Sequence, residues 1–322
     1  MFEWDTYFGA LLTGMINKDV AYSNVFAITH KLNRFGAVSF TQQPRNQLAD
    51  NSQPPVGSMV CWKLYEKYGE KWFLDTVYNS LMSWNEWWLK NRMNNGYLTW
   101  GASWNNATEQ DARWESGLDN SPMYDDVKIK NSGHNSLLNL ADVGLNSMYV
   151  MDCQYLQKMA NVLGKKNDYA VLKKREEEIS KAIQSLWNEE YGIYLNKYID
   201  SDTFSTRLSP TLFYPMIAGI PGKEQAKKML EKHFYNPEEF YGEYIIPSCA
   251  RNDKGFNNQY WQGAIWGPLN FLVYLGLKNY SEEATSELAT KSFNLFQEAW
   301  LKHNYVFENI NSEKGVLTIK IN

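Results

Sequence analysis

Residues 113–126, RWESGLDNSPMYDD, combine carboxylates and aromatic side chains in one short stretch. Glu115 and Asp119 lie four residues apart, but the Gly, Asn, Ser and Pro residues around them are turn formers, so we expect a shaped loop rather than a helix face. Carboxyl groups and a Trp brought together on such a loop could carry out acid/base chemistry on a sugar. The competing interpretation is a solvated acidic loop with Trp114 buried in the core, which is the commoner situation for a charged loop.

Aromatic residues make up 15% of the chain and include 13 Trp and 21 Tyr. Aromatic rings stack on the C–H faces of sugar rings, while their N–H and O–H groups form hydrogen bonds at the rim, so this composition fits a carbohydrate site. Some of the rings have a different role. Trp84, Trp87 and Trp88 follow the spacing i, i+3, i+4, which predicts a core stripe on one helix.

Two further candidate groups lie where helices are expected to begin. Trp4 and Asp5 open the first expected helix, although Asp5 could simply be its N-cap. Asn51 and Gln53 precede two prolines that set the first turn of another helix. Both groups are expected to face the same end of the molecule as the long loops.

The last two candidate groups lie in the C-terminal part of the chain. Tyr260, Trp261 and Gly263 occur where a loop is expected to enter a helix, and they offer stacking surface and close backbone approach. Glu308 follows Phe307 at the end of a long loop, which makes it a carboxylate in an aromatic setting. The default interpretation of such a Glu is a surface residue.

Helical periodicity covers nearly the whole chain, and almost no stretch alternates as a strand does. The expected helices are 5–16, 19–33, 54–68, 71–92, 137–163, 167–187, 208–218, 222–233, 258–277 and 281–301. Gly-containing joints lie at 68–69, 163–165, 219–222 and 275–278. Since tight joints alternate with long loops, we predict a ring of antiparallel helix hairpins with the long loops gathered at one end, where sites are built.

The chain contains no low-complexity linker, so a single domain over residues 1–322 is favoured over a split near residue 190. The net charge of −4 does not fit a nucleic-acid-binding surface, and no apolar run approaches the roughly 18 residues that span a bilayer. The first residues show no export signal, so a cytoplasmic location is expected. The sequence does not indicate an oligomeric state.

The cysteines and histidines show no pattern of a metal site. Cys61, Cys153 and Cys249 are isolated and are expected to be buried thiols. The four His residues, at positions 30, 134, 233 and 303, have no ligand spacing. We therefore expect neither a metal nor a disulfide framework.

An ordered set of motifs resembles glycoside hydrolase family 63, which includes processing α-glucosidases and mannosylglycerate or glucosylglycerate hydrolases. The motifs are WDTYF at 4–8, NSQPP at 51–55, WESGLDNSP at 114–122, SPTLFYP at 209–215, IPS at 246–248, YWQGAIWGPLN at 260–270 and ENINSEKG at 308–315. They cover nearly the whole chain in order. The resemblance implies an all-α (α/α)6 toroid of six helix hairpins with a sugar pocket at its centre.

Carried over position by position, the resemblance implies that Asp119 is the general acid and Glu308 the general base of an inverting glycosidase that needs no cofactor. Such an enzyme holds its two carboxyl groups roughly 6.5–9.5 Å apart, with a water between base and sugar. The residues implied to contact the sugar are Trp4, Asp5, Asn51, Gln53, Trp114, Glu115, Trp261 and Gly263. For Glu115 the alternative is that its charge helps to keep Asp119 protonated.

The chain departs from the family pattern at three places. Gln262 stands where YWRG is usual, so a cation is missing. ENINSEKG lacks the aromatic and the Pro of the usual ENYNPxTG around Glu308. The family normally has a helix before the first motif and another after the last, so we expect a ring that is open or incomplete at the termini.

The expected function is an inverting α-glycosidase acting on a small α-glucoside or α-mannoside, such as a glycosylglycerate or a gluco-oligosaccharide. Two alternatives stay open. A trehalase-like hydrolase is suggested because trehalases share an ESGxD core. A catalytically impaired carbohydrate-binding protein is suggested by the altered motif around Glu308.

Overall fold

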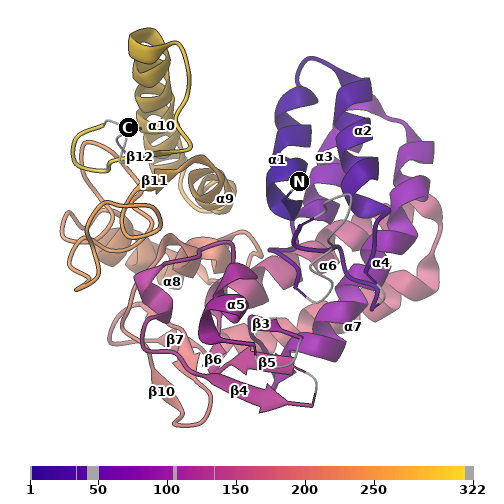
Figure 1. Cartoon of the computed structure of the whole chain (residues 1–322), viewed down its shortest axis with the longest axis horizontal. Coiled ribbons are helices and arrows are strands. Elements are labelled where there is room, and N and C mark those ends of the chain that lie inside the picture. Colours follow the sequence, from indigo (N-terminus) through magenta and orange to yellow (C-terminus); the bar gives the residue numbers. More distant parts are fainter. Residues whose placement is uncertain (1, 34, 42–50, 104–106, 134, 316–322) are drawn as a thin grey trace. The chain divides into compact units, whose positions relative to one another are not determined.

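The chain forms ten α-helices within the described residues, which are 2–33, 35–41, 51–103, 107–133 and 135–315 of a computed structural model (Figure 1). The α-helices are α1 (Glu3–Thr13), α2 (Lys18–Thr29), α3 (Gly57–Tyr68), α4 (Lys71–Arg92), α5 (Glu109–Trp114), α6 (Val143–Leu163), α7 (Lys166–Gln184), α8 (Lys223–Met229), α9 (Gly267–Leu277) and α10 (Glu282–His303). Two 3₁₀-helices, η1 (Pro122–Tyr124) and η2 (Pro210–Met216), and the π-helix η3 (Leu230–Phe234) complete the helical part.

The strands are short and line the connections between helices. They are β1 (Met93–Asn94), β2 (Tyr97–Leu98), β3 (Gly101–Ala102), β4 (Ile129–Ser132), β5 (Asn135–Leu138), β6 (Leu140–Ala141), β7 (Trp187–Asn188), β8 (Ile193–Tyr194), β9 (Lys197–Tyr198), β10 (Thr203–Phe204), β11 (Ile265–Trp266) and β12 (Asn309–Ile310). The pairs β1–β2, β3–β5, β4–β5, β7–β8, β9–β10 and β11–β12 are antiparallel. The predicted all-α class is confirmed.

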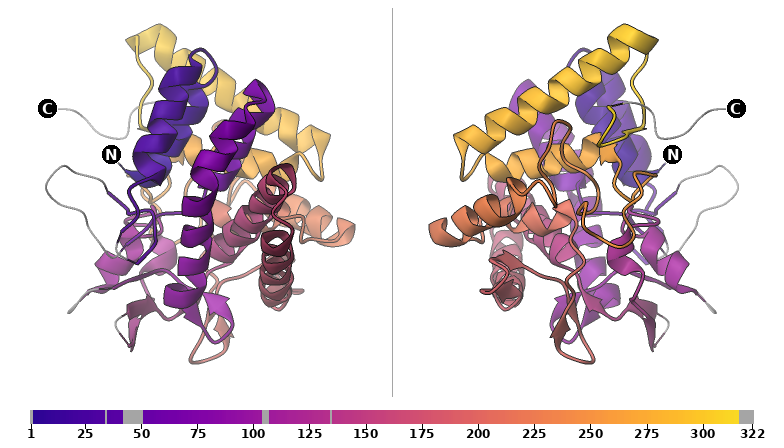
Figure 2. Two further views of the ribbon diagram at one scale, coloured as in Figure 1. Left: turned by 90° about the vertical axis from the view of Figure 1, so that its right-hand side faces the viewer. Right: turned by 90° about the vertical axis from the view of Figure 1, so that its left-hand side faces the viewer.

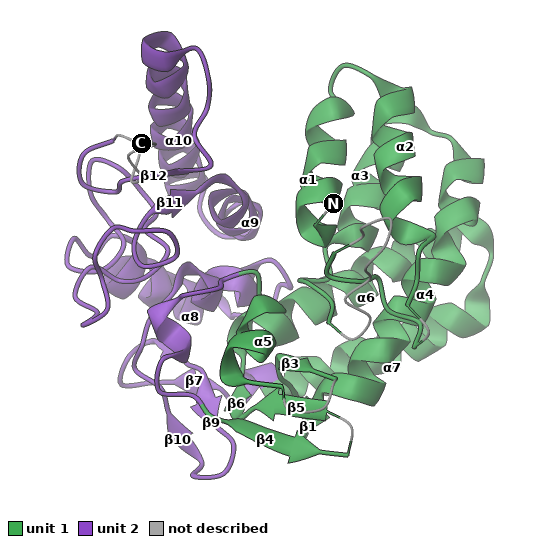
Figure 3. Ribbon diagram, in the orientation of Figure 1, with its two compact units in different colours: residues 1–117, 128–182 green, residues 118–127, 183–322 purple. Residues whose placement is uncertain are grey.

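Contacts within the chain define two compact units (Figure 3). Unit 1 comprises residues 1–117 and 128–182, and unit 2 comprises residues 118–127 and 183–322. The acidic loop is divided between them, because Glu115 belongs to unit 1 and Asp119 to unit 2. The assignment of residues 1–322 to a single domain stays a prediction.

Unit 1 is built on helix hairpins. α1 and α2 form a hairpin that packs on α3, and α6 packs against α3 and α4 (Figure 2). The predicted Trp stripe of α4 is confirmed, since Trp84, Trp87 and Trp88 are all buried. Their large apolar surfaces therefore stabilise the helix packing of unit 1.

The Gly-containing joints were only partly predicted. Gly69 and Gly164 end α3 and α6 in the left-handed conformation, as expected. Gly276 does not end a helix; it lies inside α9, where an added Cβ would approach the Met216 Cβ to 3.0 Å. α9 does end within the predicted 275–278 joint, at Leu277, but Gly276 is not the residue that ends it, since this glycine instead allows α9 to pack closely on η2.

Helix boundaries differ most where polar turns adjoin helices. α9 begins at Gly267, not at residue 258, because Asn258, Tyr260 and Gly263 have positive φ and cannot continue a helix. α6 begins at residue 143, since β5 and β6 precede it. The helix predicted over 208–218 is the shorter 3₁₀-helix η2, and α5 was not predicted.

Several predictions concern properties that the structure addresses only in part. The cysteines are buried free thiols, as expected. Across the described part of the chain, no helix combines the length and the apolar character needed to span a membrane. The predictions for the two ends of the chain and for His134 concern residues that lie outside the described ones.

Candidate active site

Glu115 is a completely buried carboxylate in unit 1. Its oxygens accept a paired hydrogen bond from the Arg92 guanidinium, at 2.6 Å from Nε and 2.8 Å from Nη2. The backbone N–H groups of Ser52 and Gly101 donate to the same carboxylate at 3.0 and 2.8 Å. Burial raises the pKa of this carboxyl above its ordinary value, although the guanidinium and the two N–H groups oppose the rise.

Arg92 is the last residue of α4 and is itself fully buried. Its guanidinium lies 4.5 Å from the centre of the Trp87 ring and donates further hydrogen bonds to Ser103 and Asn135. Glu115 thus joins the end of α4, β3 and the 51–55 segment. This geometry favours a structural role for Glu115 over the predicted contact with sugar hydroxyls.

Trp4, Asn51 and Gln53 also lie in unit 1, and hydrogen bonds tie them to the backbone. The Trp4 N–H donates to Gln53 Oε1 at 3.2 Å, and Asn51 Nδ2 donates to the Asp111 carbonyl at 2.8 Å. The Trp4 ring is nearly buried and lies against Gly117, where an added Cβ would approach it to 2.7 Å. The structure therefore brings the first two motifs and the acidic loop together within unit 1.

Asp5 and Trp114 are the exposed members of the predicted contact set in unit 1. Asp5 lies in the first turn of α1, and the N-cap position belongs to Phe2. The interpretation of Asp5 as an N-cap was therefore wrong, because the helix begins two residues earlier than expected. Trp114 is 37% exposed, compared with 5% for Trp4, so its ring is the more accessible to a ligand.

Asp119 lies in unit 2 and is partly buried. The Tyr260 hydroxyl donates to its Oδ2 at 3.2 Å. The next residue, Asn120, also contacts the 260–261 segment, because its Oδ1 accepts a hydrogen bond from the backbone N–H of Trp261 at 3.0 Å. Two adjacent hydrogen bonds thus align the acidic loop with the 260–261 segment.

Tyr260 contacts Asp119, the predicted acid, and the charge of Glu308, the predicted base, contributes to its pKa. Burial raises the pKa of Tyr260 to about 12, and the carboxylates of Asp119 and Glu308 add to the rise. Both carboxylates therefore lie within electrostatic range of this phenol. Tyr260 has φ of 50°, a left-handed conformation that is uncommon outside glycine and recurs at functional sites.

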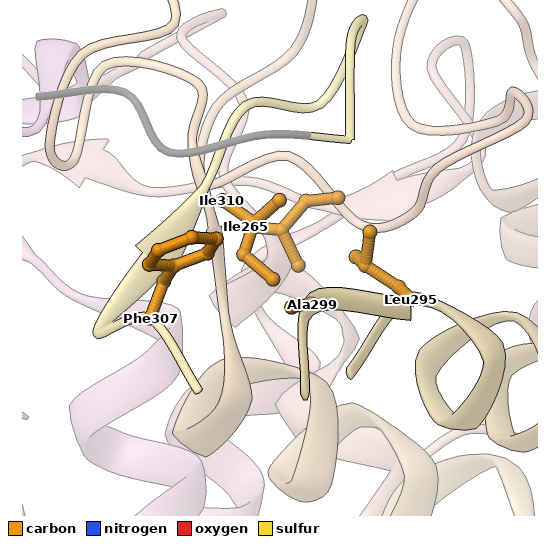
Figure 4. Close-up of a cluster of buried hydrophobic side chains, with 5 residues drawn as sticks. All are labelled: Ile265, Leu295, Ala299, Phe307 and Ile310. Atoms are coloured by element: carbon orange, nitrogen blue, oxygen red, sulfur yellow. The ribbon is translucent and has the colours of Figure 1, made fainter. Parts of the chain in front are cut away.

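Glu308 is an exposed carboxylate at the start of a short strand whose next residues are buried. β12 pairs with β11, so that Ile265 lies opposite Ile310. Ile265, Phe307 and Ile310 pack against Leu295 and Ala299 of α10 (Figure 4). This apolar cluster anchors the strand on both sides of Glu308 and leaves the carboxylate accessible to water.

The two departures in the ENINSEKG motif are accommodated by the local packing. Ile310, which replaces the usual aromatic residue, is fully buried in the cluster beside α10. Ser312, which replaces the usual Pro, donates hydrogen bonds from its N–H and its hydroxyl to Asn258 Oδ1, both at 2.8 Å. A proline lacks that N–H, so the Asn258 contact depends on the departure.

Trp261, Gln262 and Gly263 shape the turn that precedes β11. The Trp261 ring is 3% exposed and stacks on Trp266 at 3.8 Å, so much of its surface is already covered. Gln262 Oε1 accepts a hydrogen bond from Asn257 at 2.8 Å and closes the turn. Gly263 has φ of 117° and lies close to the Phe256 ring, so its missing side chain accommodates a protein neighbour.

The sequence did not single out Arg92 or Asn120. A signal for Arg92 existed, because a buried Glu requires a cation and Arg92 ends the Trp-rich helix. Asn120 adjoins Asp119, but its partner Trp261 is 141 residues away. Among the described residues, no three His, Cys, Asp or Glu side chains are arranged to hold a metal ion.

Comparison with known proteins gives one family match. The sequence model of the family described as "Mannosylglycerate hydrolase MGH1-like glycoside hydrolase domain" matches residues 1–318. The solved structure of the family 63 mannosylglycerate hydrolase from Thermus thermophilus in complex with glucose shares the fold, with a TM-score of 0.81 and 19% identity. That comparison covers 98% of this chain and 88% of the other.

Two curated relatives show the same similarity at the level of sequence. Mannosylglycerate hydrolase MGH2 of Selaginella moellendorffii is 21% identical over 83% of this chain and 62% of its own length. Cytosolic neutral trehalase of Kluyveromyces lactis is 29% identical over 59% of this chain and 28% of its own length. The chain therefore spans less than two thirds of each of these curated relatives.

Proposed function

Because the chain belongs to the family of mannosylglycerate hydrolase MGH1-like glycoside hydrolases, we propose that it hydrolyses a small α-mannoside or α-glucoside with inversion at the anomeric carbon. Asp119 acts as the general acid and protonates the leaving oxygen. Glu308 acts as the general base and removes a proton from the attacking water. Neither step requires a metal or a cofactor.

The observation that supports this proposal is the hydrogen bond from Tyr260 to Asp119, together with the membership of Asp119, Tyr260 and Glu308 in one compact unit. The two carboxylates have different surroundings, since Asp119 is partly buried and Glu308 is exposed. The inverting mechanism further requires a separation of roughly 6.5–9.5 Å between them.

Within unit 1, a sugar-binding surface would be formed by two accessible side chains. Trp114 offers an accessible ring for stacking, and Asp5 offers an accessible carboxylate for sugar hydroxyls. Trp4, Asn51 and Gln53 would support this surface from behind, because they are buried and tied to backbone groups. Within unit 2, Trp261 and Gly263 would support the segment that contacts Asp119.

The favoured substrate is a glycoside of glycerate, because the family description and the plant relative both name mannosylglycerate hydrolases. The test is a panel of mannosylglycerate, glucosylglycerate, trehalose and a glucosyl-oligosaccharide. Proton NMR of the first-formed sugar then gives the stereochemistry. Release of the β-anomer from an α-linked substrate supports inversion, and release of the α-anomer contradicts it.

Trehalose hydrolysis is the second candidate, because the yeast relative is a trehalase. Activity on trehalose alone in the panel would favour it. Sugar binding by calorimetry without any hydrolysis would instead identify a carbohydrate-binding protein. A cytoplasmic location is part of the proposal, and the yeast relative is named cytosolic.

A further inference from the structure

Arg207 is a nearly buried cation in unit 2 that contacts three carboxylates. It makes a paired interaction with Asp253, at 3.0 Å from Nε and 2.6 Å from Nη2. Its Nη1 donates to Asp126 at 3.0 Å, and its Nη2 lies 3.3 Å from Asp125. One planar guanidinium therefore bridges two chain segments, which a Lys ammonium could not do with the same geometry.

The two bridged segments are those that carry the proposed acid and its partner. Residues 118–127 include Asp119 at one end and Asp125 and Asp126 at the other. Residues 253–261 begin at Asp253 and reach Tyr260 and Trp261. The segments meet at the Asp119–Tyr260 and Asn120–Trp261 hydrogen bonds at one end, and at Arg207 at the other.

A close contact between Gly255 and the Pro122 ring lies between these two ends. An added Cβ on Gly255 would approach the Pro122 Cβ to 2.9 Å, so the two segments already touch midway. Asp253 Oδ1 also accepts a hydrogen bond from the Gly255 N–H at 2.7 Å, so the carboxylate that binds Arg207 also binds the glycine. Arg207 is therefore connected to Asp119 through both segments.

We propose that Arg207 is a positioning residue that keeps Asp119 aligned as the general acid by clamping the 118–127 segment to the 253–261 segment. The inference rests on the proposed function, because it assigns Arg207 to the acid step of that reaction. Without the guanidinium, Asp125, Asp126 and Asp253 would repel one another and separate the segments. A misplacement of about 1 Å in a catalytic group can lower the rate about 100-fold.

The clamp is ionised and reachable from solvent. The hydrogen bond from Arg207 lowers the pKa of Asp126 below its ordinary value, so this carboxylate stays charged near neutral pH. Arg207, Asp126 and Asp253 line a pocket of about 390 Å³, together with Tyr198, Phe204, Lys254 and five other residues. A guanidinium ion from solution could therefore enter and replace a missing arginine head group.

The test compares two substrates in wild type and in Arg207→Ala. One is a glycoside with a poor leaving group, which needs a proton from Asp119, and the other is the corresponding α-glycosyl fluoride, whose fluoride leaves with little acid assistance. For the glycoside, kcat should fall about 100-fold with little change in KM, because alignment and not binding is lost. For the fluoride, kcat should fall less than about fivefold.

Two further measurements separate positioning from general damage. Added guanidinium chloride, at concentrations that leave the fold intact, should restore part of the glycoside activity of Arg207→Ala. Arg207→Lys keeps the positive charge but cannot form the paired hydrogen bonds of the guanidinium, so it should show the same selective loss to a smaller degree. It replaces the alanine variant in the test if that variant does not fold. His233→Gln alters another buried side-chain contact of unit 2, the hydrogen bond between His233 and Glu239, and should affect both substrates equally.

The outcomes distinguish this inference from the proposed function. If wild type hydrolyses neither substrate, the proposed function fails and the role of Arg207 falls with it. If wild type is active but Arg207→Ala or Arg207→Lys loses both substrates equally, only the positioning role is overturned. A selective loss on the glycoside together with rescue by guanidinium supports it.

Discussion

Glu115 and Asp119 come from the same loop and stand four residues apart, yet their carboxylates have opposite environments. Glu115 in unit 1 is fully buried and accepts four hydrogen bonds from protein donors. Asp119 in unit 2 is partly buried and accepts a hydrogen bond from the Tyr260 hydroxyl. A carboxylate whose lone pairs are all used stabilises a fold, whereas an accessible one can exchange a proton with a substrate.

The same contrast separates Asp152 of unit 1 from Glu308 of unit 2. In unit 1, Asp152 is buried among Ser58 and Asn85, which both donate to it. In unit 2, Glu308 is exposed between buried neighbours. The comparison teaches that unit 1 uses its interior carboxyl groups for structure, and that the candidate reactive carboxylates lie in unit 2. The following predictions test that division.

Asp119→Asn should produce the largest effect. Loss of a positioned acid lowers turnover by roughly 10²–10⁴-fold, whereas the unfolding midpoint should hardly change because Asp119 is only partly buried. Steady-state kinetics and thermal unfolding of the same preparation check both parts. Near-normal turnover would show that Asp119 is not the general acid, and Asp119 would then no longer differ from Glu115 as a reactive carboxylate.

Glu115→Gln should have the opposite profile, with a loss of stability. Removing one partner of a buried ion pair leaves Arg92 uncompensated and lowers the free energy of unfolding by about 3–5 kcal/mol. Glu86→Gln is the matched control, because its exposed pair with Lys90 should contribute less than about 0.5 kcal/mol. A stable Glu115→Gln protein with weakened sugar binding would instead make Glu115 a ligand contact.

Asp152 should give unit 1 a pH-dependent stability. Burial raises the pKa of Asp152 from 3.8 to about 7, so the folded state binds the proton more tightly than the unfolded state. The stabilisation is fully present below the unfolded pKa and is lost as pH rises to about 7. Between pH 5 and pH 8 the free energy of unfolding should fall by roughly 2–3 kcal/mol.

Denaturant unfolding at both pH values measures this loss. Asp152→Asn should reduce it, because the variant has no proton to lose at this position whatever its constant effect on stability. Buried Glu3 and Glu115, whose pKa values are also raised, contribute with the same sign. An unchanged pH dependence in the variant would assign the whole effect to other groups.

Tyr260→Phe should have the smallest effect. The variant keeps the ring and loses the hydroxyl that donates to Asp119, so we expect kcat to fall about tenfold, in line with the loss of one hydrogen bond. Kinetics on the preferred glycoside checks this. A loss as large as that of Asp119→Asn would give Tyr260 a direct part in the reaction.

Features set by neighbours in the sequence were predicted well. The helical periodicity of α3, α4 and α10, the stops at Gly69 and Gly164 and the Trp stripe of α4 all follow from local spacing and backbone preference. The start of α9 and the role of Gly276 were not predictable. Both depend on contacts with distant segments, such as Met216 beside Gly276.

The sequence by itself determined the helix-rich class, the ordered motifs and the identity of the carboxylates that could react. Only the tertiary structure decided which carboxylate is paired and which is accessible. Arg92 reaches Glu115 from 23 residues away, and Tyr260 reaches Asp119 from 141 residues away. The physical reason is that burial and hydrogen bonding between distant residues, rather than local spacing, determine the chemistry of a carboxyl group.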